Sequence, residues 1–272
     1  MIEAHYVPET IEDMGDPRLD DYRDLKDNLL HKRSGRFVAE SFPVVVELLQ
    51  SELAVASMMM TESRWSRLAA TEAWQRRAAR PPVYVVTQTV MDEVAGFNVH
   101  RGCLAIGLRP TNTTFDPSAR LIVALEDLVD VDNVGAIVRS ACAFGAGGLL
   151  LSPNAADPYY RKAIRVAMGN TFRLPIVRAA AWPDDLLACR QRLNAKICGA
   201  VVQTEGATPL HRKPAAGAHA TILLLGAEGP GLSASVRAHC DELVTIPMAN
   251  ADSLNVATAA AVFLFQLTML DS

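Results

Sequence analysis

The sequence has few cysteines, and none of them lies in a metal-binding or redox pattern. Five cysteines are spread over 272 residues without a CxxC pair or a cluster with histidine. This spacing argues against a structural zinc and against a disulfide framework. We therefore expect no metal site and a reducing, cytoplasmic environment. The first 24 residues are acidic and lack the basic start and apolar core of a signal peptide.

Long hydrophobic runs and an excess of basic residues are also absent. The apolar stretches 221–226 and 256–267 are shorter than the roughly 20 residues that cross a bilayer, which predicts no membrane span. The formal net charge of -4 does not indicate a nucleic-acid binder, because nonspecific phosphate binding usually leaves a basic footprint. Two local basic sets fit either a solvated helix face or an RNA contact. They are Lys26, Lys32, Arg33 and Arg36, and Arg161, Lys162 and Arg165.

The chain shows no repeats, and its patterns predict two α/β parts. Residues 1–20 are acidic, contain two prolines and are expected to form an irregular arm. Residues 21–108 alternate helical and strand patterns and predict a compact α/β domain. The stretch 109–120, RPTNTTFDPSAR, has no periodicity and is the expected linker. Residues 121–272 alternate apolar strands with helices, which predicts a mostly parallel sheet covered on both faces.

Two helices of the first part are expected to be long. The apolar spacing of YRDLKDNLLHKR predicts a helix over 22–33, and SRWSRLAATEAWQRRAA predicts one over 63–79 that two prolines stop. A shorter helix over 88–96 is expected to end at a glycine.

Polar residues follow three strands of the second part, where ligands bind in open parallel sheets. After the strand that begins at 121 come Asn133 and, six residues later on an apolar helix, Arg139. Because an unpaired buried charge is costly, Arg139 is expected to meet an anion or a ring of carbonyls. A salt bridge with Glu126 or Asp127 is an equally open interpretation, and Asn133 also fits a plain helix cap.

The second and third polar clusters come later in the chain. AEGPGLS follows the expected strand TILLLG (221–226). Gly226, Gly229 and Gly231 permit close backbone approach, although a plain turn stays open. It is not a GxGxxG fingerprint, so an NAD-dependent oxidoreductase has no support. Glu228 stands in its middle. In IPMANADSLNVATAAAVFLF, Ser253 is expected to cap the terminal helix and Asn255 to lie in its first turn.

Taken in order, the three clusters resemble the three motifs of the SpoU (TrmH) family of RNA ribose 2'-O-methyltransferases, in the SPOUT class. DNVGAIVRSACAFGAGGLLLS resembles the first motif, LLLGAEGPGLS the second, and IPMANADSLNVATAAAVFLF the third. The resemblance covers about 120–270 closely. It extends loosely over 20–108, which looks like the small ribosomal-protein-like (L30e-like) substrate domain of many members. The loop 249–252 looks one residue shorter than in the family.

The resemblance implies a deep trefoil knot, S-adenosylmethionine as cofactor, and a homodimer whose active site uses both chains. It implies catalytic roles for Arg139, Asn133, Glu228, Ser253 and Asn255. It implies cofactor contacts for Leu225, Gly226, Ala227, Gly231, Ile246, Met248 and Leu254. Arg33 and Arg36 are our candidates for RNA-phosphate contacts.

The expected reaction is methylation of a ribose 2'-hydroxyl in structured RNA, with ribosomal RNA favoured over transfer RNA. A guanidinium is not readily deprotonated, so we expect Arg139 to stay charged, bind the adjacent phosphate and stabilise the developing alkoxide. Glu228 is expected to orient Arg139 or to hold its loop. The alternative is a catalytically inactive RNA-binding protein that retains the fold.

Overall fold

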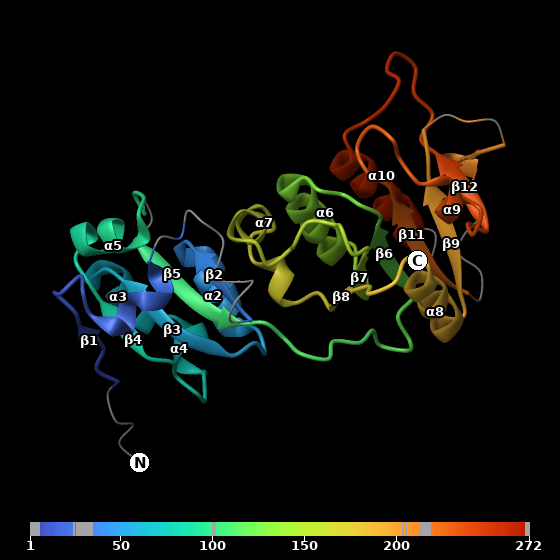
Figure 1. The fold of residues 1–272 in the computed structure, drawn as a ribbon. Helices are drawn as coiled ribbons and strands as arrows, with labels where there is room; N and C mark the ends of the chain where they lie inside the picture. Colours follow the sequence, from blue (N-terminus) through green and yellow to red (C-terminus); the bar gives the residue numbers. More distant parts are fainter. Residues whose placement is uncertain are drawn as a thin grey trace. The chain divides into compact units, whose positions relative to one another are not determined.

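The computed structural model describes residues 6–23, 25, 35–99, 102–202, 204, 206–212 and 219–269, and the chain divides into two compact units (Figure 1). The first unit comprises Met1–Thr111 and Tyr159–Phe172, and the second comprises Asn112–Pro158 and Arg173–Ser272. The change of unit after Thr111 falls within the expected linker 109–120.

The segment Tyr159–Phe172 belongs with the first unit, although the sequence assigned it to the second domain. Aromatic packing explains the difference. The rings of Tyr159 and Phe172 lie 5.2 and 5.3 Å from the ring of Phe37. Arg161 donates to a Glu40 carboxylate oxygen at 2.7 Å, so apolar and charged contacts together hold the segment in the first unit.

The first unit contains a five-stranded mixed sheet. Strand β5 (Cys103–Leu108) runs antiparallel to both of its neighbours, β2 and β3, whereas β4 is parallel to β1 and β3. In sheet order the other strands are β1 (Glu9–Thr10), β4 (Val83–Val85), β3 (Val55–Met60) and, beyond β5, β2 (Arg36–Glu40). The helical elements are η1 (Pro17–Tyr22), α2 (Phe42–Gln50), α3 (Glu62–Ala69), α4 (Glu72–Gln75), α5 (Gln88–Ala95), α7 (Arg161–Val166) and η2 (Asn170–Phe172).

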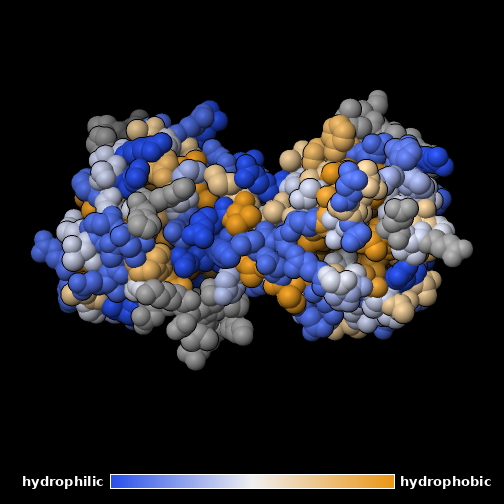
Figure 2. All heavy atoms as spheres, turned by 90° about the horizontal axis from the view of Figure 1, so that it is seen from above, coloured by the Kyte–Doolittle hydropathy of each residue, from blue (hydrophilic) through white to orange (hydrophobic). Residues whose placement is uncertain are grey.

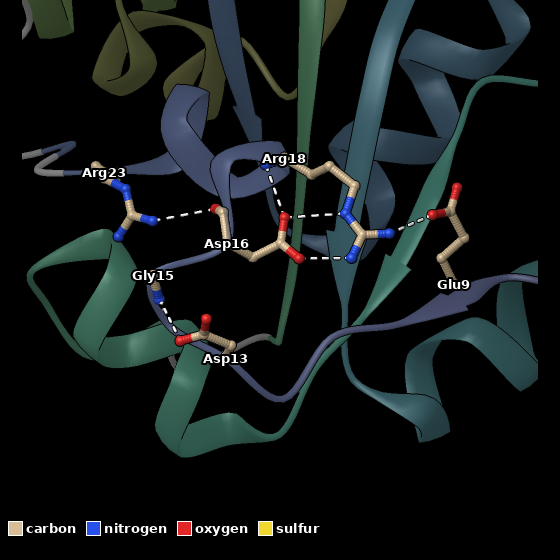
Figure 3. Close-up of polar contacts among 6 residues, drawn as sticks. All are labelled: Glu9, Asp13, Gly15, Asp16, Arg18 and Arg23. Carbon is tan, nitrogen blue, oxygen red and sulfur yellow. Dashed lines mark hydrogen bonds and ion pairs between the residues drawn. The ribbon is translucent and has the colours of Figure 1, made fainter.

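The expectation of an irregular acidic arm is wrong for the described residues from 6 onward. Strand β1 pairs with the edge of β4, and Leu19 and Tyr22 are fully buried. Figure 3 shows the guanidinium of Arg18 between the carboxylates of Asp16 and Glu9. The burial of Leu19 and Tyr22 and the ion pairs of Arg18 therefore order this segment. The expected helix over 22–33 lies almost wholly outside the described residues.

Of the other two helices expected in the first unit, one is divided and one ends where expected. The expected helix over 63–79 is divided into α3 and α4, because Thr71 caps the second piece by accepting from the Trp74 amide at 3.3 Å. The expected end of the third helix at Gly96 is confirmed, since α5 ends there with a left-handed φ of 72°.

The second unit contains the predicted parallel sheet. All seven described strands are parallel. Their order is β10 (Thr208–Pro209), β12 (Glu242–Thr245), β9 (Ala195–Ala200), β11 (Ala220–Leu225), β6 (Leu121–Leu125), β7 (Gly148–Leu151) and β8 (Ile176–Arg178). The helical elements are α6 (Val131–Ala143), α8 (Asp184–Leu193), η3 (Leu210–Arg212), α9 (Ala234–Arg237) and α10 (Val256–Met269).

Helices cover both faces of this sheet, as expected for strands of nearly continuous apolar sequence. On one face, Ile222 and Leu224 of β11 share a buried cluster with Leu186 of α8 and Val236 of α9. Helix α10 packs against α6 and β11, as the ribbon shows (Figure 1). None of the described helices is both long and apolar enough to cross a bilayer.

Candidate functional site

A cavity of about 410 Å³ opens in the second unit where β9, β11 and β12 end. Its wall includes Ala200 at the end of β9, Leu225 at the end of β11 with the glycine turn that follows it, and Ile246 just after β12. Three separated strand ends therefore meet at one crevice, as expected for an open parallel sheet. The lining includes all seven residues for which the sequence implied cofactor contacts, namely Leu225, Gly226, Ala227, Gly231, Ile246, Met248 and Leu254.

The glycine turn closes tightly on itself, and we call the approach of its two ends, Gly226 and Gly231–Leu232, the close crossing. A Cβ on Gly226 would lie 2.3 Å from the carbonyl carbon of Gly231 and 2.4 Å from the amide nitrogen of Leu232. Between them, the Gly231 amide donates to the Ala227 carbonyl at 2.9 Å. Only glycine at 226 lets the two passes of chain approach so closely, and the crossing shapes the floor of the cavity.

Asn255, not Ser253, caps the terminal helix. The Asn255 side-chain oxygen accepts from the amides of Ala257 at 2.9 Å and Thr258 at 3.2 Å, and α10 begins at the next residue, Val256. The expectation that Ser253 was the cap is therefore wrong. Ser253 lies two residues before the cap, exposed and in the cavity lining.

A chain of amide and carboxylate groups joins the three motifs, and its two ends, Asn255 and Glu228, line the cavity. Asn255 donates from Nδ2 to the Asn133 Oδ1 at 2.9 Å. Asn133 in turn donates from its own Nδ2 to a Glu228 carboxylate oxygen. Asn133 is not a plain cap, because Asp130 caps α6 by accepting from the amides of Asp132 and Asn133. The Asn133 side chain is therefore available to the neighbouring motifs.

Glu126 has a different partner from the one that the sequence suggested. Its carboxylate is buried, with 5% of the residue exposed. It accepts from the amide and the hydroxyl of Ser233 at 2.8 and 2.7 Å, and from the indole nitrogen of Trp182 at 3.2 Å. Its hydrogen-bonding capacity is used to hold the end of the glycine turn. Asp127 likewise accepts from the Ser152 hydroxyl at 2.6 Å.

Arg139 stands apart from the other predicted catalytic residues. It is exposed on α6 and is not among the described residues that line the cavity. Within the described part of the chain its guanidinium forms no ion pair with Glu126, Asp127 or Glu228, and no hydrogen bond. The alternative of a salt bridge with Glu126 or Asp127 is therefore wrong, because Arg139 lies exposed on α6 and not buried beside them.

The two basic sets of the sequence differ in their surroundings. Arg33 lies outside the described residues, and Arg36 forms an ion pair with Asp21. Arg161 pairs with Glu40 and lies over the ring of Phe97 at 4.2 Å. Arg161 is thus a structural residue of the first unit.

Several cavity residues were not anticipated from the sequence. Val201, Val202 and Thr204 follow β9, and Arg237 ends α9. The position of Val201 and Val202 just after an apolar strand could have identified them. Helix α9 has four residues, too few for a periodic signal, so the direction of Arg237 could not be predicted.

Comparison with known proteins places this geometry in context. Residues 120–265 match the model of the SpoU rRNA Methylase family. Similar proteins include uncharacterized tRNA/rRNA methyltransferases of Mycobacterium bovis and Mycobacterium tuberculosis. Each is 36% identical over 267 residues, which cover 94% of this chain and 90% of the relative.

Solved structures share the fold of nearly the whole chain. The AdoMet-bound rRNA methyltransferase from Sinorhizobium meliloti has a TM-score of 0.82 at 23% identity, covering 96% of this chain and 97% of that one. The AdoMet complex of the SpoU methyltransferase AviRb from Streptomyces viridochromogenes has a TM-score of 0.79 at 24% identity, covering 94% and 98%. With the family model matching more than half of its length, this chain belongs to the SpoU rRNA methylase family.

Proposed function

We propose that this protein transfers a methyl group from S-adenosylmethionine to a ribose 2'-hydroxyl of structured RNA. The observation that carries the proposal is the hydrogen-bonded chain Asn255–Asn133–Glu228, which joins all three family motifs and of which Glu228 and Asn255 line one cavity. Its relatives from Mycobacterium are described as tRNA/rRNA methyltransferases, which supports RNA methylation. Among RNAs, we favour ribosomal over transfer RNA as substrate.

The cavity residues fit S-adenosylmethionine. The volume of the cavity, about 410 Å³, is in the range of small-molecule sites, and the apolar wall of the cavity suits an adenine. The crossing at Gly226 exposes backbone groups beside that wall. Two solved relatives of the same fold are described as AdoMet-bound. When bound, this cofactor supplies an electrophilic methyl group on a sulfonium.

The protein's own side chains would position the RNA and stabilise charge. Asn255 is fixed by the helix that it caps, and it orients Asn133 and, through it, Glu228. Ser253 adds a hydroxyl to the wall of the same cavity. Arg139, charged throughout, binds the phosphate next to the target ribose and stabilises the oxygen as its proton leaves to that phosphate or to water.

We further propose a homodimer in which Arg139 serves the partner's cavity. Within one protomer the described lining of the cavity lacks Arg139. Helix α10 also exposes large apolar side chains, with Val262 39% and Phe265 50% accessible. Figure 2 shows apolar residues scattered among hydrophilic ones on the face drawn. We expect a second copy to cover Val262 and Phe265.

The roles of the two units are part of the proposal. The first unit would be an L30e-like domain that binds RNA, with Arg33 and Arg36 as contacts. The second would be the knotted SPOUT methyltransferase domain. Five free cysteines support a cytoplasmic location.

Mapping of 2'-O-methyl groups tests the reaction. Purified protein, labelled S-adenosylmethionine and RNA from cells that lack the gene should give one new site at which the RNA resists alkaline cleavage. Label on a base, or labelled RNA that alkali still cleaves at the site, would contradict ribose methylation. S-adenosylmethionine binding without any transfer to RNA would favour the catalytically inactive alternative.

Mixing two inactive variants tests the shared site. Arg139→Ala and Glu228→Ala should each be inactive alone, with RNA methylation reduced about 100-fold or more, as for loss of a charge-stabilising group. After subunit exchange in an equal mixture, we expect about a quarter of wild-type activity, because half of the dimers are mixed and each has one complete site. No recovery, with exchange verified by mass, would place both residues in the same protomer's site.

A further inference from the structure

Arg237 is a cation in the cavity to which the proposed reaction assigns no role. It is half-buried at the end of α9. Among the described residues of the lining, Arg237 and Glu228 are the charged ones. The Arg237 guanidinium forms no ion pair or hydrogen bond with any residue that the structure describes. A cation held beside an apolar wall without an internal partner is suited to an anionic group of a ligand.

The backbone that carries Arg237 is firmly held. Ser233 caps α9 by accepting from the Val236 amide at 3.3 Å. The same Ser233 donates its amide and hydroxyl to the buried carboxylate of Glu126. Val236, which precedes Arg237, is fully buried. The base of the Arg237 side chain therefore has a fixed position, and only the long side chain must be ordered by a ligand.

We propose that Arg237 binds the carboxylate of the methionine part of S-adenosylmethionine. This inference rests on the cofactor proposed above. The cofactor carries two cations, the sulfonium and the ammonium, and one anion, the carboxylate. A guanidinium beside either cation would be repelled, whereas it can bind a carboxylate through two parallel hydrogen bonds. Glu228, which Asn133 orients, can then interact with the sulfonium or the ammonium.

This assignment has a kinetic consequence. The product, S-adenosylhomocysteine, keeps the carboxylate, so Arg237 stabilises bound substrate, transition state and bound product alike. Such uniform binding lowers the KM for the cofactor without changing kcat. Arg237 is therefore a cofactor-binding residue and has no part in proton or methyl transfer.

Calorimetry with a matched pair of ligands tests the inference. The full-length protein and Arg237→Gln are titrated with S-adenosylmethionine and with decarboxylated S-adenosylmethionine, which lacks only the carboxylate. We expect Arg237→Gln to weaken S-adenosylmethionine binding about 10- to 100-fold, the effect of one or two charge-assisted hydrogen bonds. Binding of the decarboxylated ligand should change by less than about twofold, and Arg237→Lys should recover part of the loss.

Controls separate this inference from the proposed function. Arg76→Gln removes an exposed arginine of the first unit and should bind both ligands as the wild type does. Thermal melting of each variant verifies that it folds. An equal loss for both ligands, or no loss for either, would overturn the role of Arg237 alone. A wild-type protein that failed to bind S-adenosylmethionine would overturn the cofactor assignment and this inference with it.

Discussion

Replacing Gly226 with alanine is the most direct test of the backbone crossing that shapes the cavity. The new Cβ would lie 2.3 to 2.5 Å from three backbone atoms of Gly231 and Leu232. Ordinary contacts of a Cβ begin near 3.4 Å, so one pass of chain must retreat by about 1 Å. Because the obstructing atoms are backbone, no side-chain rotation relieves the overlap.

Gly226→Ala should lower both the stability of the fold and the affinity for S-adenosylmethionine. Overpacking of this kind costs about 1–3 kcal/mol of unfolding free energy. At roughly 2–4 °C per kcal/mol for a chain of this size, Tm should fall by several degrees. A cavity wall displaced by about 1 Å misplaces its hydrogen-bonding groups, so the Kd for S-adenosylmethionine should rise at least about tenfold.

The matched control is Gly229→Ala, three residues away in the same turn. Gly229 has a φ of 86°, and an added Cβ there would meet nothing within 4 Å. This change carries local backbone strain without overlap, so it should lower Tm yet affect cofactor binding far less than Gly226→Ala. Calorimetry and thermal melting measure both quantities. If Gly226→Ala binds and melts like the wild type, the close crossing does not exist and our account of the cavity is wrong.

Three further predictions concern stability. Ser41 has φ 89° and ψ 147°, a conformation that strains any residue but glycine. Ser41→Gly should therefore raise the free energy of unfolding, measured in urea, by about 1 kcal/mol. An unchanged free energy of unfolding would exclude strain at this position. Hydrogen bonds from Arg18 lower the pKa of Asp16 to about 2 from its usual 3.8. A lowered pKa stabilises the fold above pH 3.8, and this contribution is lost as the pH falls through 2. Asp16→Asn should therefore melt below wild type at pH 6, and the difference should shrink as the pH falls from 3.8 to 2; a difference as large at pH 2 as at pH 6 would contradict this sign. Glu126→Gln and Ser233→Ala should each lower the free energy of unfolding by about 1–3 kcal/mol, and a double-mutant cycle should give a coupling energy of at least about 0.5 kcal/mol. Additive losses would show that the two residues do not act together.

Much of the second unit could be predicted because its strands are continuous apolar runs and its polar residues gather where those runs end. The parallel sheet follows from that alternation, and the convergence of strand ends brings Asn133, Glu228 and Asn255 together. The choice of helix cap could not be made in the same way. Ser253 and Asn255 are both good capping residues two positions apart, and only the backbone path decides between them.

Other features could not be predicted because they depend on contacts distant in sequence. The acid-rich composition before residue 20 conceals Leu19, which tertiary packing buries. Arg139 lies on an otherwise apolar helix, which suggests burial, but the helix surface around it is left open. Glu126 is separated by about a hundred residues from Ser233, the partner that satisfies it.

The return of Tyr159–Phe172 to the first unit has a consequence for how the protein folds as it is made. The ring of Phe37 and the carboxylate of Glu40 acquire their partners from a segment synthesised more than a hundred residues later. A shortened protein ending at Thr111 would expose that ring and leave that acid without its arginine. During translation, then, the first unit cannot complete its packing until Phe172 has left the ribosome, even though its sheet strands have emerged long before.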